Sequence, residues 1–339
     1  MFLTHVFSPS VGGIEVNAEI LAQAFAHAGH EVRLVTWTGN ELGKPFPYAV
    51  VRRPSRWQLL QAHRWADIVF ENNPCLRLSW PNLLISRPNV VSLNMWVARV
   101  DGTTGWADRL KFAWFRRASG VIAVSDALRR GCWPSAVVIG NPYRPAIFRR
   151  LPEVPPTTTF VFLGRLVPDK GVDVAIRALQ QLNASSAGAA QSLTIIGAGP
   201  ERASLEALVA TLGLTAQVAF VGTLQGEALT HCLNRHRFLL VPSTCEEAFG
   251  NVVLEGMACG CVPVVSNAGG LPEAVGPAGL TFRRGNVDAL AACLQQVLSQ
   301  PALEQSLRAA APAHLRQHRP EVVAERYLSF IQNAVNRAH

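Results

Sequence analysis

Short apolar runs alternate with amphipathic segments along the first half of the chain. An apolar run at residues 2–7 is followed by a tight turn at Gly12-Gly13 and by apolar positions with helical spacing that end near Gly29. This order predicts a strand followed by a helix. Further runs that predict strands lie at residues 31–36, 67–70, 90–93, 121–124 and 136–139. The rhythm is typical of βα units that build a parallel sheet.

A second series of the same kind follows a change in composition. Residues 141–159 contain five prolines with several arginines and threonines, which suit neither a helix nor a central strand. The next apolar runs lie at residues 160–163, 192–196, 218–221, 238–241, 262–265 and 280–282. The predicted fold class is therefore α/β, with two Rossmann-like domains facing each other across a cleft at the strand C-terminal ends.

The predicted boundaries follow from these patterns. Residues 1–145 are predicted to form the N-terminal domain, residues 146–158 the linker, and residues 159–318 the C-terminal domain. Residues 319–339 form a C-terminal helix, for which packing back on the N-terminal domain is one interpretation.

Composition narrows the class of protein. The chain has 339 residues, of which 49% are hydrophobic and 16% charged, so two domains with strands buried on both faces are expected. Seven scattered cysteines without a C-x-x-C pair indicate neither a disulfide framework nor a zinc site. No apolar run reaches the roughly 18 residues that span a bilayer, and the start lacks a signal-peptide pattern, so we expect a cytoplasmic protein.

The net charge of +8 implies an anionic partner. Phosphate-bearing substrates, nucleic acid and an acidic membrane surface all meet this condition. The sequence carries no helix-turn-helix, RNA-recognition or zinc-finger signature, so no nucleic-acid partner is expected.

Two glutamates, Glu247 and Glu255, frame a predicted helix N-terminus. Glu247 lies in the polar loop after a strand that stops at Pro242, and Glu255 lies more than one turn inside a helix that opens at Gly250. The exposed N–H groups of that first turn favour an anion such as a diphosphate, with a carboxylate on each side for hydroxyl groups. In the alternative, Glu255 belongs to a solvated helix face, and Glu246 and Glu247 only acidify the helix N-terminus.

Two cations follow the first strand of the second half. Arg165 comes after Gly164, and Lys170 comes before Gly171, beside a predicted helix start. Such a pair can clamp a diphosphate and stabilise the charge that grows as a phosphate ester bond breaks. The alternative is a pair of surface cations.

Five motifs in order resemble a known family. Their forms are Gly-Arg…Lys-Gly, Gly-x-Gly-Pro, Pro-Ser…Glu-x7-Glu, Met-Ala-x-Gly-x-Pro-Val-Val and Gly-Gly-x-x-Glu, across about residues 159–317. Together they resemble the donor-binding domain of retaining glycosyltransferases of the two-Rossmann GT-B fold, in particular family 4, which includes bacterial enzymes for glycolipids and surface polysaccharides. The first half is similar only through residues 7–15 and its βα pattern.

The resemblance implies an enzyme that moves a sugar from a nucleoside-diphosphate sugar to a glycan or lipid-linked acceptor. It implies retention at the anomeric carbon, a role in cell-surface polysaccharide or glycolipid synthesis, and no cofactor. The nucleotide, uridine or guanosine, stays open. A catalytically silent scaffold protein that only binds the nucleotide sugar is the alternative.

The same resemblance implies roles for single residues. Arg165 and Lys170 correspond to the diphosphate clamp, Glu247 to the group that holds donor-sugar hydroxyls, and Glu255 to the acceptor of the ribose hydroxyls. The other implied donor contacts are Gly13, which meets the donor phosphates, and backbone groups at Gly164, Gly197, Gly222, Phe249, Gly250, Asn251 and Val252.

One position departs from the family pattern. Members commonly carry a histidine after the strand that corresponds to residues 90–93, whereas this chain has Asn94 there, also a candidate catalytic residue. An amide donates and accepts hydrogen bonds but takes up no proton. In the family, that histidine reaches the donor sugar near its C6 end. Either the donor of this chain differs near C6 of its sugar, or the correspondence between Asn94 and the histidine is displaced by a few residues.

Two further patterns concern metal and membrane. No D-x-D pair occurs among the seven aspartates, so we expect no metal site and a reaction that needs no divalent metal. Residues 106–117 are dense in aromatic and basic residues. They suit a helix on an acidic bilayer, which would place the protein on the inner face of the membrane, or a core-packing helix with a basic exposed side.

Overall fold

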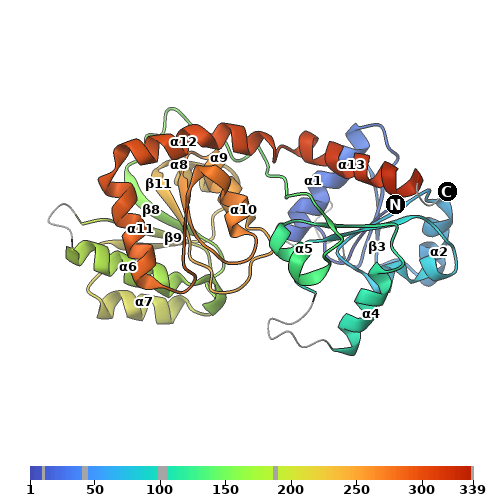
Figure 1. Cartoon of the computed structure of the whole chain (residues 1–339), viewed down its shortest axis with the longest axis horizontal. Coiled ribbons are helices and arrows are strands. Elements are labelled where there is room, and N and C mark those ends of the chain that lie inside the picture. Colours follow the sequence, from blue (N-terminus) through green and yellow to red (C-terminus); the bar gives the residue numbers. More distant parts are fainter. Residues whose placement is uncertain (10–11, 40–44, 98–104, 186–189, 337–339) are drawn as a thin grey trace. The chain divides into compact units, whose positions relative to one another are not determined.

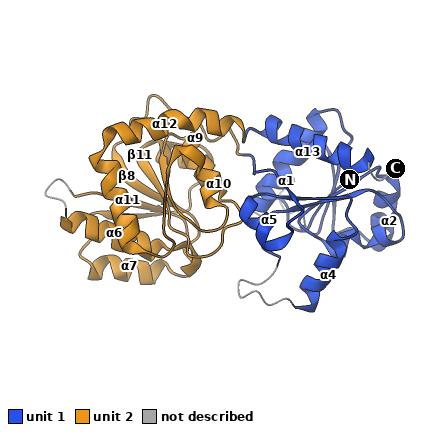
Figure 2. Ribbon diagram, in the orientation of Figure 1, with its two compact units in different colours: residues 1–142, 318–339 blue, residues 143–317 orange. Residues whose placement is uncertain are grey.

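The computed structural model describes residues 1–9, 12–39, 45–97, 105–185 and 190–336 (Figure 1). It consists of two compact units, which Figure 2 shows in separate colours. Unit 1 comprises Met1–Pro142 and His318–His339, and unit 2 comprises Tyr143–Gln317. Each unit is built around a sheet in which all paired strands are parallel. The α/β class with two Rossmann-like units is therefore confirmed.

The sheet of unit 1 has the strand order β3-β2-β1-β4-β5-β6-β7. Phe2 at its centre lies opposite Leu34 on one neighbouring strand and Phe70 on the other. The strands are β1 (Phe2–Thr4), β2 (Arg33–Thr36), β3 (Ala49–Arg52), β4 (Val69–Asn72), β5 (Asn89–Leu93), β6 (Gly120–Ala123) and β7 (Val137–Val138).

Helices cover both faces of this sheet. One apolar cluster joins the strands to α1 and α13, and a second joins them to α2 and α3. The helices are α1 (Gly13–His27), α2 (Arg56–Trp65), α3 (Leu76–Ser79), the 3₁₀ turn η1 (Trp80–Leu83), α4 (Trp106–Phe115), α5 (Asp126–Cys132) and α13 (Pro320–Asn336).

The last helix, α13, packs on the sheet of unit 1. Tyr327 is fully buried there, and its hydroxyl lies 3.1 Å from the hydroxyl of Ser92 on β5. Phe330 occupies the space next to Gly120, where an added Cβ atom would lie only 2.6 Å from the ring. The chain therefore enters unit 2 at Pro142–Tyr143 and returns to unit 1 at Gln317–His318.

The sheet of unit 2 has the strand order β10-β9-β8-β11-β12-β13. Its strands are β8 (Thr158–Leu163), β9 (Leu193–Ile196), β10 (Val218–Gly222), β11 (His236–Val241), β12 (Val262–Ser266) and β13 (Leu280–Phe282). Its helices and 3₁₀ turns are η2 (Pro168–Lys170), α6 (Val172–Ser185), α7 (Arg202–Thr211), α8 (Gly226–Asn234), α9 (Asn251–Ala258), α10 (Leu271–Val275), η3 (Gly276–Ala278), α11 (Val287–Ser299) and α12 (Pro301–Arg316).

Each apolar run that predicted a strand overlaps an observed strand, although the ends of run and strand differ by a few residues. Strand β3 was missed, because it is a short edge strand whose residues are only partly buried. Residues 146–158, predicted as a linker, belong to unit 2 in the division described above.

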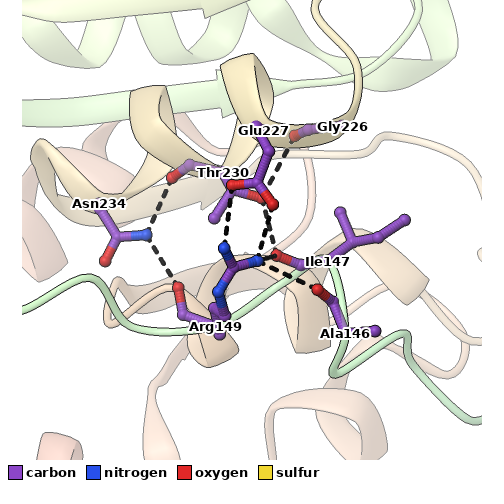
Figure 3. A network of polar contacts seen from close by, with 7 residues as sticks. All are labelled: Ala146, Ile147, Arg149, Gly226, Glu227, Thr230 and Asn234. Carbon is purple, nitrogen blue, oxygen red and sulfur yellow. Dashed lines mark hydrogen bonds and ion pairs between the residues drawn. The ribbon is translucent and has the colours of Figure 1, made fainter.

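A polar network fastens the start of that segment to α8 (Figure 3). The buried amide of Asn234 accepts from the N–H of Leu151 at 2.8 Å and donates to the carbonyl of Arg149 at 3.0 Å. The hydroxyl of Thr230 donates to the carbonyl of Ile147 at 2.9 Å. The guanidinium of Arg149 donates to both carboxylate oxygens of Glu227, at 2.8 and 3.1 Å, in an exposed pair.

We predict that the buried hydrogen bonds of this network, and not its exposed ion pair, contribute to the unfolding free energy. Asn234→Ala leaves an N–H and a carbonyl without their partner, which should cost about 2–4 kcal/mol of unfolding free energy. Glu227→Ala removes only an exposed ion pair and should leave stability unchanged within error. Urea denaturation followed by circular dichroism measures the difference.

The tryptophans provide a control for this experiment. All eight precede residue 134 and therefore lie in unit 1. Tryptophan fluorescence should report the same unit 1 transition in both variants. Equal losses of unfolding free energy from Asn234→Ala and Glu227→Ala would contradict the prediction that the buried hydrogen bonds matter more than the ion pair.

Candidate functional site

The candidate residues of unit 2 lie at one edge of its sheet, at strand ends, in loops and in the first two turns of α9. Strands β9, β8, β11 and β12 are consecutive neighbours, and all run parallel. Their C-terminal ends therefore meet at the same edge, which is where open α/β sheets bind ligands. The loop after β8 carries Arg165 and Lys170, and the loop after β11 carries Glu247.

Lys170 and Glu247 form an ion pair across these two loops. Nζ of Lys170 lies 2.6 Å from Oε1 of Glu247, and their side chains are 20% and 19% exposed. The same Oε1 accepts a hydrogen bond of 2.7 Å from the hydroxyl of Ser243, which is almost fully buried. Within the described residues no donor bonds the other oxygen, Oε2. The carboxylate is thus held by one oxygen and leaves the other for a ligand.

Ser243 is the site residue that the sequence analysis missed. Its motif, Pro-Ser, was part of the pattern, but no role was derived for the hydroxyl. Ser243 is itself tied to β12, since the hydroxyl of Ser266 donates to its carbonyl at 2.7 Å. The signal in the sequence is a serine directly after a buried strand and four residues before a candidate carboxylate.

Glycines let the backbones of these loops approach closely. Gly171 has a φ of +64°, and an added Cβ atom would lie 2.1 Å from the carbonyl oxygen of Pro242. Gly269 has a φ of +56°, and its Cβ would lie 2.1 Å from the carbonyl oxygen of Glu247. The next N–H, of Gly270, donates to that carbonyl at 2.8 Å. Lys170 and Glu247 are therefore positioned by backbone contacts that side chains would prevent.

The candidate glycines Gly164, Gly197 and Gly222 lie at the ends of three adjacent strands. Gly197 has a φ of +143°, and its Cβ would lie 1.8 Å from the carbonyl oxygen of Gly164. The N–H of Gly197 donates to the carbonyl of Gly222 at 2.8 Å. These glycines form one continuous stretch of backbone along the sheet edge.

The helix predicted to begin near Gly250 begins at Asn251, as α9. Gly250 precedes it with a φ of +107° and has no side chain to cap the helix. An added Cβ there would lie 2.4 Å from the Leu271 side chain. Phe249 is buried, whereas Asn251 and Val252 are partly exposed in the first turn. The positive end of this helix dipole follows directly on the loop of Glu247.

Glu255 lies in the second turn of α9 and is half-buried. Burial raises the pKa of its carboxyl group to about 7, and the charge of Arg144 opposes that increase. Within the described residues no hydrogen bond reaches this carboxylate. Glu255 is thus a desolvated acceptor without a hydrogen-bond partner among the described residues, which suits a role toward ligand hydroxyls.

The two predicted clamp cations differ. Lys170 is paired with Glu247, whereas Arg165 is exposed and has no ion-pair partner among the described residues. Arg165 is therefore the cation that is free to meet an added anion.

The two candidates in unit 1 are Gly13 and Asn94. Gly13 is the first residue of α1 and is exposed. Asn94 is buried after β5, where its Oδ1 accepts from the Asn17 side chain at 2.8 Å and its Nδ2 donates to the Asn72 side chain at 2.9 Å. Both ends of the Asn94 amide are thus used inside unit 1. A catalytic role for Asn94 stays a prediction.

Two properties of the described residues bear on metal binding and on membrane insertion. No group of three or more His, Cys, Asp or Glu side chains that could hold a metal ion occurs among them. No described helix is both long enough and apolar enough to cross a membrane.

Comparison with known proteins identifies the family. Residues 144–314 match the model of the Glycosyl transferases group 1 family, so the chain belongs to this family. The D-inositol 3-phosphate glycosyltransferase of Rhodococcus opacus is 33% identical over 168 residues, 47% of this chain and 37% of that protein. A GDP-mannose-dependent phosphatidylinositol monomannoside mannosyltransferase of Corynebacterium glutamicum is 31% identical over 178 residues, 50% of this chain and 46% of that protein. The matched region thus spans less than half of either relative.

Solved structures show the fold. The structure of Anabaena HepE in complex with UDP superposes with a TM-score of 0.83 and 19% identity, covering 98% of this chain and 99% of that one. A glycosyltransferase of Rickettsia africae superposes with a TM-score of 0.80 and 17% identity, covering 98% of each chain. The chain therefore has the GT-B fold.

We predict that Glu255 makes stability depend on pH. Its pKa is about 7 in the folded protein and near 4.5 when unfolded, so the folded state holds a proton that the unfolded state loses. Stability should fall as pH rises from about 4.5 to 7 and level off above. Glu255→Gln removes this penalty, so its melting temperature should match the native protein near pH 5 and exceed it at pH 8. Glu153→Gln, at an exposed position of unit 2, serves as a control. A difference between native protein and Glu255→Gln that is independent of pH would contradict the prediction.

Proposed function

We propose that this protein transfers a sugar from a nucleoside-diphosphate sugar, a UDP- or GDP-sugar, to a glycan or lipid-linked acceptor. One observation carries the proposal. In a chain of the group 1 family, Glu247 is held by Lys170 and Ser243 through a single oxygen, beside the start of α9 and the free cation Arg165. Groups that can accept hydroxyls and groups that can bind an anion thus lie at one sheet edge, and a nucleotide sugar carries both hydroxyls and a diphosphate.

Each of these groups has a proposed role toward one part of the donor. Arg165, Lys170 and the N-terminal turn of α9 bind the diphosphate and stabilise the charge on the departing group. Oε2 of Glu247 accepts hydroxyls of the donor sugar, and Glu255 accepts the ribose hydroxyls. The backbone at Gly164, Gly197 and Gly222 lies against the nucleotide.

The proposed reaction retains the anomeric configuration and needs no divalent metal. The acceptor hydroxyl attacks the anomeric carbon on the face from which the diphosphate departs. The bond between that carbon and the phosphate oxygen breaks, the new glycosidic bond forms, and the departing oxygen takes the acceptor proton. Cationic side chains and the helix dipole supply the positive charge.

Both nucleotide classes have support among similar proteins. Anabaena HepE was crystallised with UDP, and the Corynebacterium relative is named for GDP-mannose. The name of the Corynebacterium relative states that its acceptor is a phosphatidylinositol monomannoside. This supports a glycolipid or surface-polysaccharide acceptor for this chain.

We predict selective stabilisation by one nucleoside diphosphate. A ligand present at 100 times its dissociation constant adds about 2.7 kcal/mol of stability, which should raise the melting temperature of the bound unit by about 5–10 °C. Thermal unfolding followed by circular dichroism, with UDP, GDP, ADP or dTDP and with or without magnesium, identifies the nucleotide. The shift should not require magnesium. No shift with any of them at millimolar concentration would overturn the proposed donor site.

Arg165 provides the residue-level form of this test. Arg165→Ala removes a charge-assisted hydrogen bond, so nucleotide affinity should fall about 10- to 100-fold. Arg177→Ala is a matched control, because Arg177 is also an exposed cation of unit 2 but lies on α6. Equal affinities of the two variants would contradict the role of Arg165.

We predict that Ser243 acts by positioning Glu247. Ser243→Ala removes one donor to Oε1, so transfer should slow about 5- to 10-fold while affinity for the free nucleoside diphosphate stays unchanged. In a background of Glu247→Gln the same substitution should have little further effect, since its target carboxylate is gone. Assays of transfer and nucleotide binding on the four variants measure this coupling. Additive effects on transfer would show that Ser243 does not act through Glu247.

A further inference from the structure

We propose that the exposed face of α4 is a docking surface for an anionic membrane. We define this surface as Trp106, Arg109, Leu110 and Ala113 of α4 together with Arg116 and Arg117 of the turn that follows it. The proposal deepens the function proposed above and rests on it, because it selects a lipid-linked acceptor at a bilayer. α4 lies at the periphery of unit 1 (Figure 1).

The surface results from helical spacing. Trp106, Leu110 and Ala113 follow one another at intervals of four and three residues, so they lie on one side of α4. Trp106 is 78% exposed and Leu110 is 50% exposed. Arg109 precedes Leu110 on the helix, Arg116 and Arg117 lie in the turn that follows the helix, and all three arginines are exposed. An indole and a leucine thus lie among cations on the outer face.

The opposite face fixes the helix to unit 1. Trp114 donates from its ring N–H to Oε1 of the buried Glu71 at 2.7 Å. The ring of Phe115 packs edge-on against Trp133, with centroids 5.6 Å apart. Trp114 and Phe115 therefore belong to the core, as the core-packing interpretation of the sequence expects. Trp106 is exposed on a helix that is itself anchored.

The charge of this surface has one sign. Arg109, Arg116 and Arg117 have no ion-pair partner among the described residues. The single acidic residue of α4, Asp108, points away from the surface, accepting from the N–H of Gly105 at 3.1 Å and pairing with Lys111 at 3.5 Å. The cations are therefore available to lipid phosphates.

The mixture of groups favours a bilayer over a nucleic acid. Nucleic-acid binding uses cations against phosphates and rewards stacking rings, but an exposed leucine gains nothing from a phosphate backbone. At a membrane interface, in contrast, tryptophan and leucine enter the boundary region while arginines contact anionic head groups. We therefore assign the surface to anionic lipid.

Vesicle sedimentation of the full chain tests the proposal. The protein should bind vesicles of phosphatidylglycerol and phosphatidylcholine at low salt, and phosphatidylcholine alone should bind it much less. Each arginine near an anionic surface contributes about fivefold in affinity. Arg109→Gln, Arg116→Gln and Arg117→Gln together should therefore reduce binding about 100-fold. Trp106→Ala with Leu110→Ala should also reduce it.

The control removes the same charge elsewhere. Arg130, Arg202 and Arg319 are exposed and lie in other helices or beside one, where they pair with Asp126, Glu206 and Glu321. Their replacement by glutamine lowers the net charge equally and should change vesicle binding far less than the α4 variant does. Equal losses would mean that the overall charge of the chain binds the vesicles, and this would overturn the proposal.

Two further readouts separate this proposal from the proposed function. The α4 variants should keep the melting shift with the nucleoside diphosphate, which depends on unit 2. No vesicle binding by the native protein at low salt, with a normal nucleotide shift, would overturn the membrane surface alone. Preferential binding of a single-stranded oligonucleotide that the α4 variants lose would also overturn it, in favour of nucleic acid.

Discussion

The candidate site depends on the close approach of backbones at the strand ends of unit 2. Gly171, Gly197 and Gly269 each bring their Cα within reach of a neighbouring carbonyl, at a distance where a Cβ atom would lie about 2 Å from oxygen. Their positive φ values are accessible to glycine at little cost. The loops that carry Lys170 and Glu247 are therefore held by the main chain, and their side chains need little further ordering when a ligand binds.

This arrangement also gives the charged side chains of the site different surroundings. Lys170 and Ser243 both bind the same oxygen of Glu247, which lies in a partly buried loop. Arg165 lies in the loop of Lys170 but outside this pair, and it faces solvent. Glu255 differs again, since burial without a hydrogen-bond donor raises its pKa. Three kinds of charged group thus result from one loop-and-helix arrangement, through differences in pairing and burial.

The sequence predicted the parts of this structure that depend on local pattern. Buried parallel strands read as continuous apolar runs, and glycines before a helix start mark places of close approach. The pairing of Lys170 with Glu247 joins residues 77 positions apart, and the contact of Ser243 with Glu247 depends on the loop conformation, so neither follows from periodicity. The contacts of Asn94 could not be predicted for the same reason, because its partners Asn17 and Asn72 come from α1 and β4.

The asparagine cluster of unit 1 connects the Asn94 position to the two places where the chain leaves and re-enters that unit. The Asn17 amide donates to Asn94 and, at 3.2 Å, to the side chain of Asn141, one residue before unit 1 ends. The carbonyl of Asn141 accepts from Nδ1 of His318, the first residue after the return. Neutral amides can satisfy one another in a buried site without a charge to desolvate. A histidine that took up a proton at position 94 would place a charge among them. The amide at this position therefore preserves the network that ties both crossings to the strand ends of unit 1.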